Sequence, residues 1–290
     1  MTLFMAKVPR YLMSFLLFAG AVAGCSTLLQ TTPLATVALP HEHEFRRGNL
    51  IFHNDAEVSE NHPLFLELAS FPEQVCKKLE LPVTDQPIHI HLFKDRVSYE
   101  QYVQHEFKDI PSRRALFVMR PGTAAQKQET LQVLCFWGDR IQDDLRHELT
   151  HATLHGILHN LPLWLDEGLA MYFEVGIAAQ GKHQRALTAM EPQINNGTWK
   201  YDLDRLESLK EVSQMGLVDY YEAWAWVYYL KHSDAANAAC LHGYLKDRLR
   251  PDAPSTSLQQ RWSPLGTVPG QQLPEYLKKL LEERSTWPHG

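Results

Sequence analysis

Two histidines and a glutamate within one short stretch have the types and the spacing of a metal site. Residues 147–151 read H-E-L-T-H. On a helix, His147 and His151 would differ by about 40° around the axis and about 6 Å along it, so both imidazoles can reach one small cation. Zn²⁺ suits two neutral imidazoles and leaves room for a third protein ligand and a water. Glu148 lies about a quarter turn from His147, where it can take a proton from that water.

A third ligand is expected from the helix that follows. Asn160, Leu161 and Pro162 interrupt the first helical pattern, and Pro162 suits the first turn of a new helix over 162–174. If this helix folds back on the first, Glu167 faces the two histidines. A carboxylate in that place leaves the fourth position open for water, which is the arrangement of a catalytic zinc.

Other side chains nearby are weaker candidates. His155 is about 12 Å along the axis from His147, too far to share a metal in an unbroken helix. We therefore interpret His155 and His159 as groups on the helix surface or beside a ligand. Asp166 points about 100° away from Glu167, and Glu174 is interpreted as a solvated residue. Mn²⁺ or Co²⁺ could occupy the same ligands as Zn²⁺.

The segment before the histidines predicts how their helix is positioned. Residues 129–137 (ETLQVLCFW) are apolar and β-prone, which favours a buried strand that ends at Gly138. Asp139 has the position of an N-cap, and Gln142 would complete a capping box. One face of the helix would pack inward, and the two histidines lie on a neighbouring face. The inward residues are Ile141, Leu145, Leu149, Ala152 and Gly156.

Taken together, the two motifs resemble the gluzincin metallopeptidases. H-E-L-T-H followed by W-L-D-E-G-L-A is most similar to the peptidase MA-like branch, whose second motif commonly reads W-x-x-E-G-x-A. The similarity covers about residues 85 to 232. It implies Glu148 as the general base and the following zinc ligands: His147, His151 and Glu167. The metzincin pattern does not fit, because Leu and Ile stand at positions 154 and 157, where that pattern requires Gly and His.

The resemblance also implies a group that stabilises the oxyanion. Residues 220–230 (YYEAWAWVYYL) match a family segment that reads Y-x-x-S-W-A-x-x-x-x-L, except that Ala223 replaces Ser. Tyr220 occupies the matching position and Tyr221 is its neighbour. Either an oxyanion-stabilising hydroxyl or a helix that only packs the molecule is consistent with this segment.

The first 25 residues are typical of a bacterial lipoprotein signal. Lys7 and Arg10 form a basic region, and a short apolar run over 11–23 leads to Val-Ala-Gly-Cys at 22–25. This lipobox-like sequence implies cleavage before Cys25 and acylation of that cysteine. Ser26 resembles an outer-membrane sorting signal. We expect a protein of the cell envelope, anchored by lipid to the outer membrane and facing the periplasm.

Charge and cysteine usage exclude several classes of function. The net charge is −6, and loss of the signal segment would make it more negative, which argues against a nucleic-acid partner. Cys76, Cys135 and Cys240 remain after Cys25, so at most one intramolecular disulfide can form. Cys76 and Cys135 are interpreted as buried small hydrophobic residues. The chain has no P-loop, no C-x-x-C and no G-x-S-x-G motif.

Apolar periodicity predicts an α+β protein of two lobes. Strands are expected at 49–53, 87–93, 116–119 and 131–137, and helices at 63–81 (bent or split at Pro72) and 98–107 (with Ser98 and Gln101 as a capping pair). Further helices are expected at 202–212, 217–232, 235–249 (with Asp234 as its N-cap) and 274–284. In the implied zincin-like fold, a mixed sheet packs on the active-site helix and an all-α lobe follows. The predicted parts are a signal peptide (1–24), a tether (25–42), an α/β lobe with the H-E-x-x-H motif (43–175) and a helical lobe (176–290).

The sequence thus predicts a zinc metallopeptidase with one Zn²⁺ per chain and a peptide or protein substrate. Two alternatives stay open. A zinc that is structural or vestigial would make the protein an envelope scaffold or binding module, and Ala223 is the feature that favours this reading. A zinc amidase that acts on peptidoglycan peptides would share the chemistry but not the substrate.

Overall fold

The computed structural model describes residues 38–108, 110, 112–122, 129–253, 257–262 and 272–287. The predicted signal peptide, most of the predicted tether and the predicted lipidation residue Cys25 lie outside the described residues. Among the described helices, none combines the length and the apolar character needed to traverse a lipid bilayer.

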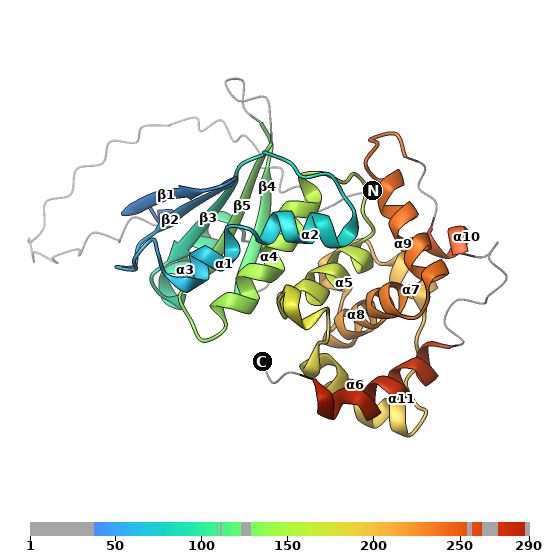
Figure 1. Ribbon diagram of the computed structural model, residues 1–290. Coiled ribbons are helices and arrows are strands. Elements are labelled where there is room, and N and C mark those ends of the chain that lie inside the picture. Colours follow the sequence, from blue (N-terminus) through green and yellow to red (C-terminus); the bar gives the residue numbers. More distant parts are fainter. Residues whose placement is uncertain are drawn as a thin grey trace, which may run out of the picture.

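A five-stranded mixed sheet forms the first half of the protein (Figure 1). The spatial order is β1-β2-β3-β5-β4. The central strands β2, β3 and β5 run parallel, and β1 and β4 pair antiparallel at the two edges. The strands are β1 (His43–Arg47), β2 (Leu50–Asn54), β3 (Ile88–Phe93), β4 (Ala115–Arg120) and β5 (Thr130–Phe136).

Alternation along β3 explains which face of the sheet is apolar. Ile88, Ile90 and Leu92 are buried on one face, as the period of two predicts. His89 and His91 point to the other face, where the ring of His53 from β2 stacks on both. The first strand, β1, was not predicted, because its side chains are mostly exposed and it forms only through a hairpin with β2.

Helices cover both faces of this sheet. On the apolar face, α1 (Pro63–Leu68), α2 (Phe71–Leu79) and α4 (Ile141–His155) share one core with β2, β3 and β5. On the other face, α3 (Arg96–Glu106) packs through a smaller aromatic cluster. The single helix expected over 63–81 is split in two, with Pro72 in the first turn of α2.

Two predicted helix caps are wrong. In α3 a nearby aspartate takes the capping position, and before α4 the predicted capping residue pairs with an arginine of another segment. α3 begins before the expected Ser98, because the carboxylate of Asp95 accepts the Ser98 N–H at 2.8 Å. Asp139 does not cap α4, because its carboxylate pairs with Arg114 at 2.7 Å. The N-cap of α4 is Arg140, whose side chain makes no capping bond.

A helical region follows the sheet and surrounds α8 (Figure 1). α8 contains the buried Trp224 and Trp226 and contacts α5, α6, α9 and α11. The helices are α5 (Leu163–Glu174), α6 (Gln184–Asn195), α7 (Leu203–Ser208), α8 (Leu217–His232), α9 (Ala235–Asp247), α10 (Leu258–Trp262) and α11 (Leu273–Glu283). Short 3₁₀ helices lie at Ile177–Ala179, Val212–Gln214 and Arg284–Thr286.

The expected fold class is confirmed: the protein is α+β, with a mixed sheet packed on the helix that carries the H-E-x-x-H motif, followed by a helical region. α6 and α10 were not predicted as elements. The domain boundaries remain predictions, although β1 begins at His43 and α5 ends at Glu174.

The three described cysteines are buried and unpaired. Burial raises the pKa of the thiols of Cys76, Cys135 and Cys240, that of Cys76 to about 11. They are therefore poor nucleophiles, and the interpretation of Cys76 and Cys135 as small hydrophobic residues is confirmed.

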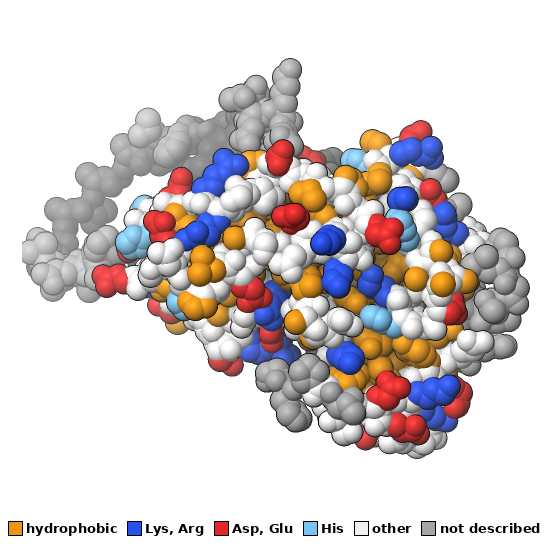
Figure 2. All heavy atoms as spheres, viewed as in Figure 1, with side chains coloured by type: hydrophobic (Ala, Val, Ile, Leu, Met, Phe, Trp, Pro, Cys, Tyr) orange, Lys and Arg blue, Asp and Glu red, His pale blue; other side chains and the backbone are white. Residues whose placement is uncertain are grey.

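The surface in view carries no large area of one charge. On the face shown in Figure 2, acidic and basic side chains lie interspersed with apolar ones.

Candidate metal centre

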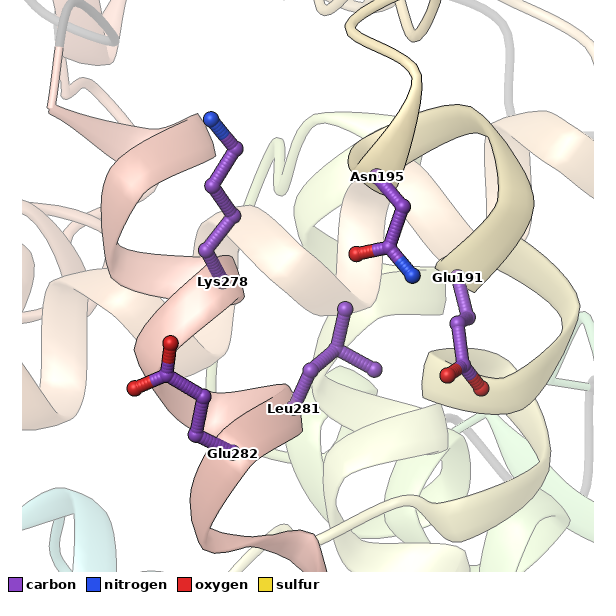
Figure 3. Close-up of a pocket in the computed structure, with 5 residues that line it drawn as sticks. All are labelled: Glu191, Asn195, Lys278, Leu281 and Glu282. Atoms are coloured by element: carbon purple, nitrogen blue, oxygen red, sulfur yellow. The ribbon is translucent and has the colours of Figure 1, made fainter.

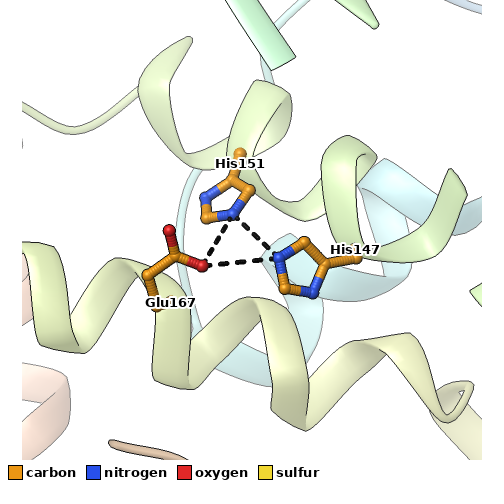
Figure 4. A group of neighbouring side chains, drawn as sticks. All are labelled: His147, His151 and Glu167. Carbon is orange, nitrogen blue, oxygen red and sulfur yellow. Dashed lines mark hydrogen bonds and ion pairs between the residues drawn. The ribbon is translucent and has the colours of Figure 1, made fainter. Parts of the chain in front are cut away.

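α4 presents the two histidines because its other faces are taken by the core. Leu145, Leu149 and Ala152 have no exposed surface and pack against the sheet. His147 and His151 lie on the neighbouring face, towards α5 (Figure 4). The inward face that the sequence predicts is therefore the one that orients the histidines.

The chain reverses direction between α4 and α5 through residues suited to a turn. Asn160 has a φ of 54°, a left-handed conformation that asparagine tolerates better than most residues. Pro162 then precedes α5 as its N-cap. All but one of the residues of α5 are buried, as expected for a helix that is apolar around most of its circumference. The two helices pack closely, which brings Glu167 to the histidines.

Gly168 allows α8 to approach α5. A Cβ atom at this position would lie 2.6 Å from the carbonyl oxygen of Ala223 and 2.9 Å from Cγ2 of Val227. Ala223 itself is fully buried in this contact. The backbone of Ala223 therefore forms part of the contact that brings α8 against α5.

Three ligand atoms converge between α4 and α5 (Figure 4). Nε2 of His147 lies 3.2 Å from Nε2 of His151. Oε2 of Glu167 lies 3.4 Å from the first nitrogen and 3.5 Å from the second. The three atoms thus form a nearly equilateral triangle.

The size and chemistry of this triangle fit zinc. Zinc–ligand bonds of about 2.0–2.1 Å in a tetrahedron place neighbouring ligand atoms about 3.3–3.4 Å apart. The three observed separations match this edge length. Two imidazole nitrogens and one carboxylate oxygen are also the donor set of a catalytic zinc, which keeps a fourth position open.

The outer nitrogen of His147 is bound by a carboxylate. Nδ1 of His147 lies 2.8 Å from Oε2 of Glu174, and Oε1 of Glu174 lies 2.7 Å from Nε2 of His183. Glu174 is 8% exposed, so its interpretation as a solvated residue is wrong. It lies two turns after Glu167 on α5, which places both acids on the face towards α4.

The outer nitrogen of His151 lies beside a second carboxylate, as an ion pair. Nδ1 of His151 lies 2.9 Å from Oδ1 of Asp166, and Nε2 of His155 lies 2.8 Å from Oδ2 of the same carboxylate. These three residues form a second group whose atoms are close enough to hold an ion. Because Nε2 of His151 already faces Glu167, we interpret Asp166 and His155 as supports of this ligand. His159 is exposed, away from both groups.

Buried acids give the centre a field that favours positive charge. Burial alone would lower the pKa of both histidines. Glu167 and Glu174 outweigh it and raise the pKa of His147, and Asp166 and Glu167 do the same for His151. In return, the histidines lower the pKa of the three carboxyl groups against the opposing effect of burial. The same buried carboxylates would stabilise a divalent cation at the ligand triangle.

Glu148 lies beside the ligand triangle with a basicity raised by its surroundings. Burial raises the pKa of Glu148; the charges of His147 and His151 lower it and that of Glu167 raises it, with a net increase. A carboxylate with a raised pKa accepts a proton more readily near neutral pH, as a general base must.

Tyr220 interacts electrostatically with residues of the centre. Burial raises the pKa of Tyr220 to about 12, and the charges of Glu167 and Glu148 contribute, whereas Arg113 lowers it through its charge and a hydrogen bond. Tyr221 is buried in the main core. These electrostatic contacts with Glu167 and Glu148 make Tyr220 the stronger of the two tyrosine candidates.

A surface pocket lies elsewhere in the helical region. Figure 3 shows it between α6 and α11, where it is lined by Glu191, Asn195, Lys278, Leu281 and Glu282. None of these side chains belongs to the metal centre or its supports. It therefore has no part in the chemistry considered below.

Comparison with known proteins does not identify a family for this chain. No protein-family model and no curated protein matches the sequence. Among solved structures, the crystal structure of an M1 zinc metallopeptidase from Deinococcus radiodurans matches with a TM-score of 0.36 and 16% identity. The match covers 87% of this chain and 53% of that chain, so this protein spans about half the length of its match. The likeness is too distant to assign an activity.

Proposed function

We propose that this protein is a zinc-dependent peptidase. The observation that carries the proposal is the ligand triangle of His147, His151 and Glu167, with spacing that fits a tetrahedral zinc. Glu148, the residue after His147, interacts electrostatically with all three ligands, and its pKa is raised. A purely structural zinc needs a fourth protein ligand and no adjacent base.

When bound, Zn²⁺ supplies a Lewis acid that polarises the scissile carbonyl and makes a water acidic near neutral pH. Glu148 takes the proton of the attacking water and passes it to the leaving nitrogen, so one carboxyl group acts first as base and then as acid. The hydroxyl of Tyr220 donates a hydrogen bond to the carbonyl oxygen as negative charge develops there. Glu174 and Asp166 hold the two imidazoles in orientation.

The edge strand β4 supports a peptide as the substrate. Among the described strands, β4 pairs only with β5, so one of its edges can accept another strand. Phe117 of β4 stacks near the rings of His155 and His151, with centroid distances of 5.4 Å and 6.4 Å. An extended peptide added to this edge would run beside the ligand triangle, held by main-chain hydrogen bonds that tolerate varied sequences.

We also propose that the protein acts in the cell envelope, anchored to the membrane through acylated Cys25. The support is the order of a basic region, a short apolar run and the lipobox-like Val-Ala-Gly-Cys. A globule close to a membrane surface would reach peptides of the envelope rather than of the cytoplasm.

The test combines metal content with peptide release. The purified protein should contain about one zinc per chain, and Glu167→Ala should lose most of it. Glu148→Gln should keep the zinc and lose about 10²- to 10⁴-fold in the rate of peptide hydrolysis, the usual contribution of a general base. Absence of zinc from the folded, zinc-supplemented protein would refute the proposal.

The remaining outcomes separate the alternatives. Stoichiometric zinc with no hydrolysis of any peptide would indicate a scaffold or binding module. Release from cell-wall fragments but not from proteins would indicate an amidase of peptidoglycan peptides. Zinc that is unaffected by Glu167→Ala would mean that the third ligand is a different residue, with His155 as the first to examine.

A further inference from the structure

Each metal-facing histidine is the first member of a chain of three side chains. From His147 the chain continues through Glu174 to His183, and from His151 through Asp166 to His155. His155 belongs to α4 itself. His183 lies outside both metal helices, directly before α6 in the helical region. The first chain therefore links the metal centre to the N-terminus of α6.

The position of His183 fixes where its proton lies. His183 is the N-cap of α6, and its Nδ1 accepts the backbone N–H of Ala186 at 3.1 Å. A ring nitrogen that accepts a hydrogen bond carries no proton, so in the neutral ring the proton is on Nε2. Nε2 then donates to Oε1 of Glu174 at 2.7 Å.

This donation determines the form of the metal ligand. With Oε1 of Glu174 held by His183, Oε2 is oriented to accept from Nδ1–H of His147 at 2.8 Å. A proton on Nδ1 leaves the lone pair of Nε2 directed at the ligand triangle, which is the tautomer that binds a metal.

No described side chain stands ready to replace His183. It is 2% exposed, and Glu174 is 8% exposed, so water has little access to the bond between them. The other cation near Oε1 of Glu174 is the guanidinium of Arg140, at 4.0 Å, beyond hydrogen-bonding distance. Without His183, Glu174 would be a buried carboxylate with one oxygen unsatisfied, free to turn away from His147.

We propose that His183 is a positioning residue for the metal: acting through Glu174, it sets the tautomer and the ring orientation of His147. The inference rests on the proposed zinc site. It assigns to the N-terminus of α6 a role in metal affinity that is separate from its role in helix stability.

Two substitutions separate these roles. His183→Asn keeps an acceptor at the position of Nδ1, and asparagine is among the best N-caps, but its amide is too short to reach Glu174. His183→Gln places an amide N–H near the position of Nε2 and so keeps the donor, while glutamine is a poor cap. The first variant should keep the helix cap and lose the metal support, and the second should do the reverse.

The measurements are zinc affinity by competition with a chelator and the midpoint of thermal unfolding of the metal-free protein. His183→Asn should weaken zinc binding 10- to 100-fold, the usual effect of losing such a support, with little change in the midpoint. His183→Gln should keep most of the affinity and lower the midpoint. His62 also caps a helix, α1, with an accepting Nδ1, so His62→Asn is the matched control and should leave zinc affinity unchanged.

The outcomes distinguish this inference from the proposed function. If the unsubstituted protein binds no zinc, the metal centre itself is refuted. If it binds zinc and His147→Ala abolishes binding, but His183→Asn leaves the affinity unchanged, only the role of His183 is refuted. The inference would also be overturned if, in both the Asn and the Gln variant, zinc affinity fell only in proportion to the loss of thermal stability. His183 would then have a structural role alone.

Discussion

Substitution of Gly168 by alanine tests whether the contact between α5 and α8 sets the position of Glu167. The added Cβ would meet the carbonyl oxygen of Ala223 at 2.6 Å and its carbonyl carbon at 2.8 Å. Both are backbone atoms of a buried helix, so no side chain can rotate away. The two helices must move apart, or α5 must shift along its axis with Glu167.

The expected cost follows from two opposing effects. Overpacking of a core typically costs about 1–3 kcal/mol, and a clash with backbone belongs at the upper end. Replacing a glycine within a helix by alanine gains about 1 kcal/mol of helix propensity. We therefore expect Gly168→Ala to lower the free energy of unfolding by about 2 kcal/mol. Zinc affinity should fall as well, because the triangle edges depend on the position of Glu167.

Denaturant unfolding of the metal-free protein measures the first effect, and chelator competition measures the second. Gly243→Ala in α9 is the control, since the three atoms nearest to its Cβ would all belong to the guanidinium of Arg261, the far end of a flexible side chain. That variant should be as stable as the unsubstituted protein or more so. Equal stability and equal zinc affinity in the Gly168→Ala variant would refute the argument that this contact positions the ligand.

Three further changes should have measurable effects. Removing zinc with a chelator should lower the midpoint of thermal unfolding, because a ligand at a hundred times its Kd stabilises by about 2.7 kcal/mol; an unchanged midpoint would contradict a site formed in the fold. Tyr220→Phe should lower kcat by about 10²- to 10³-fold, as for one oxyanion donor, with little change in zinc content; a rate close to that of the unsubstituted protein would exclude this role. Burial and the neighbouring charges of His53, His89 and Arg120 lower the pKa of His91 to about 3. Between pH 6.5 and 3 the imidazole of His91 is therefore protonated in the unfolded chain but not in the folded chain. The free energy of unfolding must then fall as the pH falls. From pH 6.5 to 5 this loss amounts to about 2 kcal/mol, and denaturant curves of His91→Leu should show a flatter dependence on pH.

Elements defined by their own local pattern could be predicted from the sequence. The expected helix over 217–232 has the same bounds as α8, because its aromatic run is long and has clear ends. Asp234 caps α9 as expected, with its side chain accepting the N–H of Asn237. β3 differs from its prediction by one residue. In each case the residues that define the element lie within it.

Features that depend on distant partners could not be predicted in the same way. Asp139 has the correct type and position for a cap, but Arg114 on another segment binds it. His183 belongs to the metal centre only through Glu174, and no local pattern at residue 183 indicates this contact. The contact of Glu174 could have been predicted, since its two-turn spacing from Glu167 places both residues on one face of α5. If α5 is assumed to be buried, this face lies against α4, and a contact between Glu174 and His147 is expected.

The ligand triangle is local in sequence, and this has a consequence for the order of folding. His147, His151 and Glu167 all lie on α4 and α5, consecutive helices joined by the short segment 156–162. Closing so short a loop has a small entropic cost, so the helical hairpin can bring its ligand atoms together before α6 and α8 have docked. A cation bound at that stage would hold α4 and α5 together and stabilise the partly folded hairpin. Zinc would then accelerate folding as well as stabilise the native state. The site would be complete when α6 docks and places His183 beside Glu174.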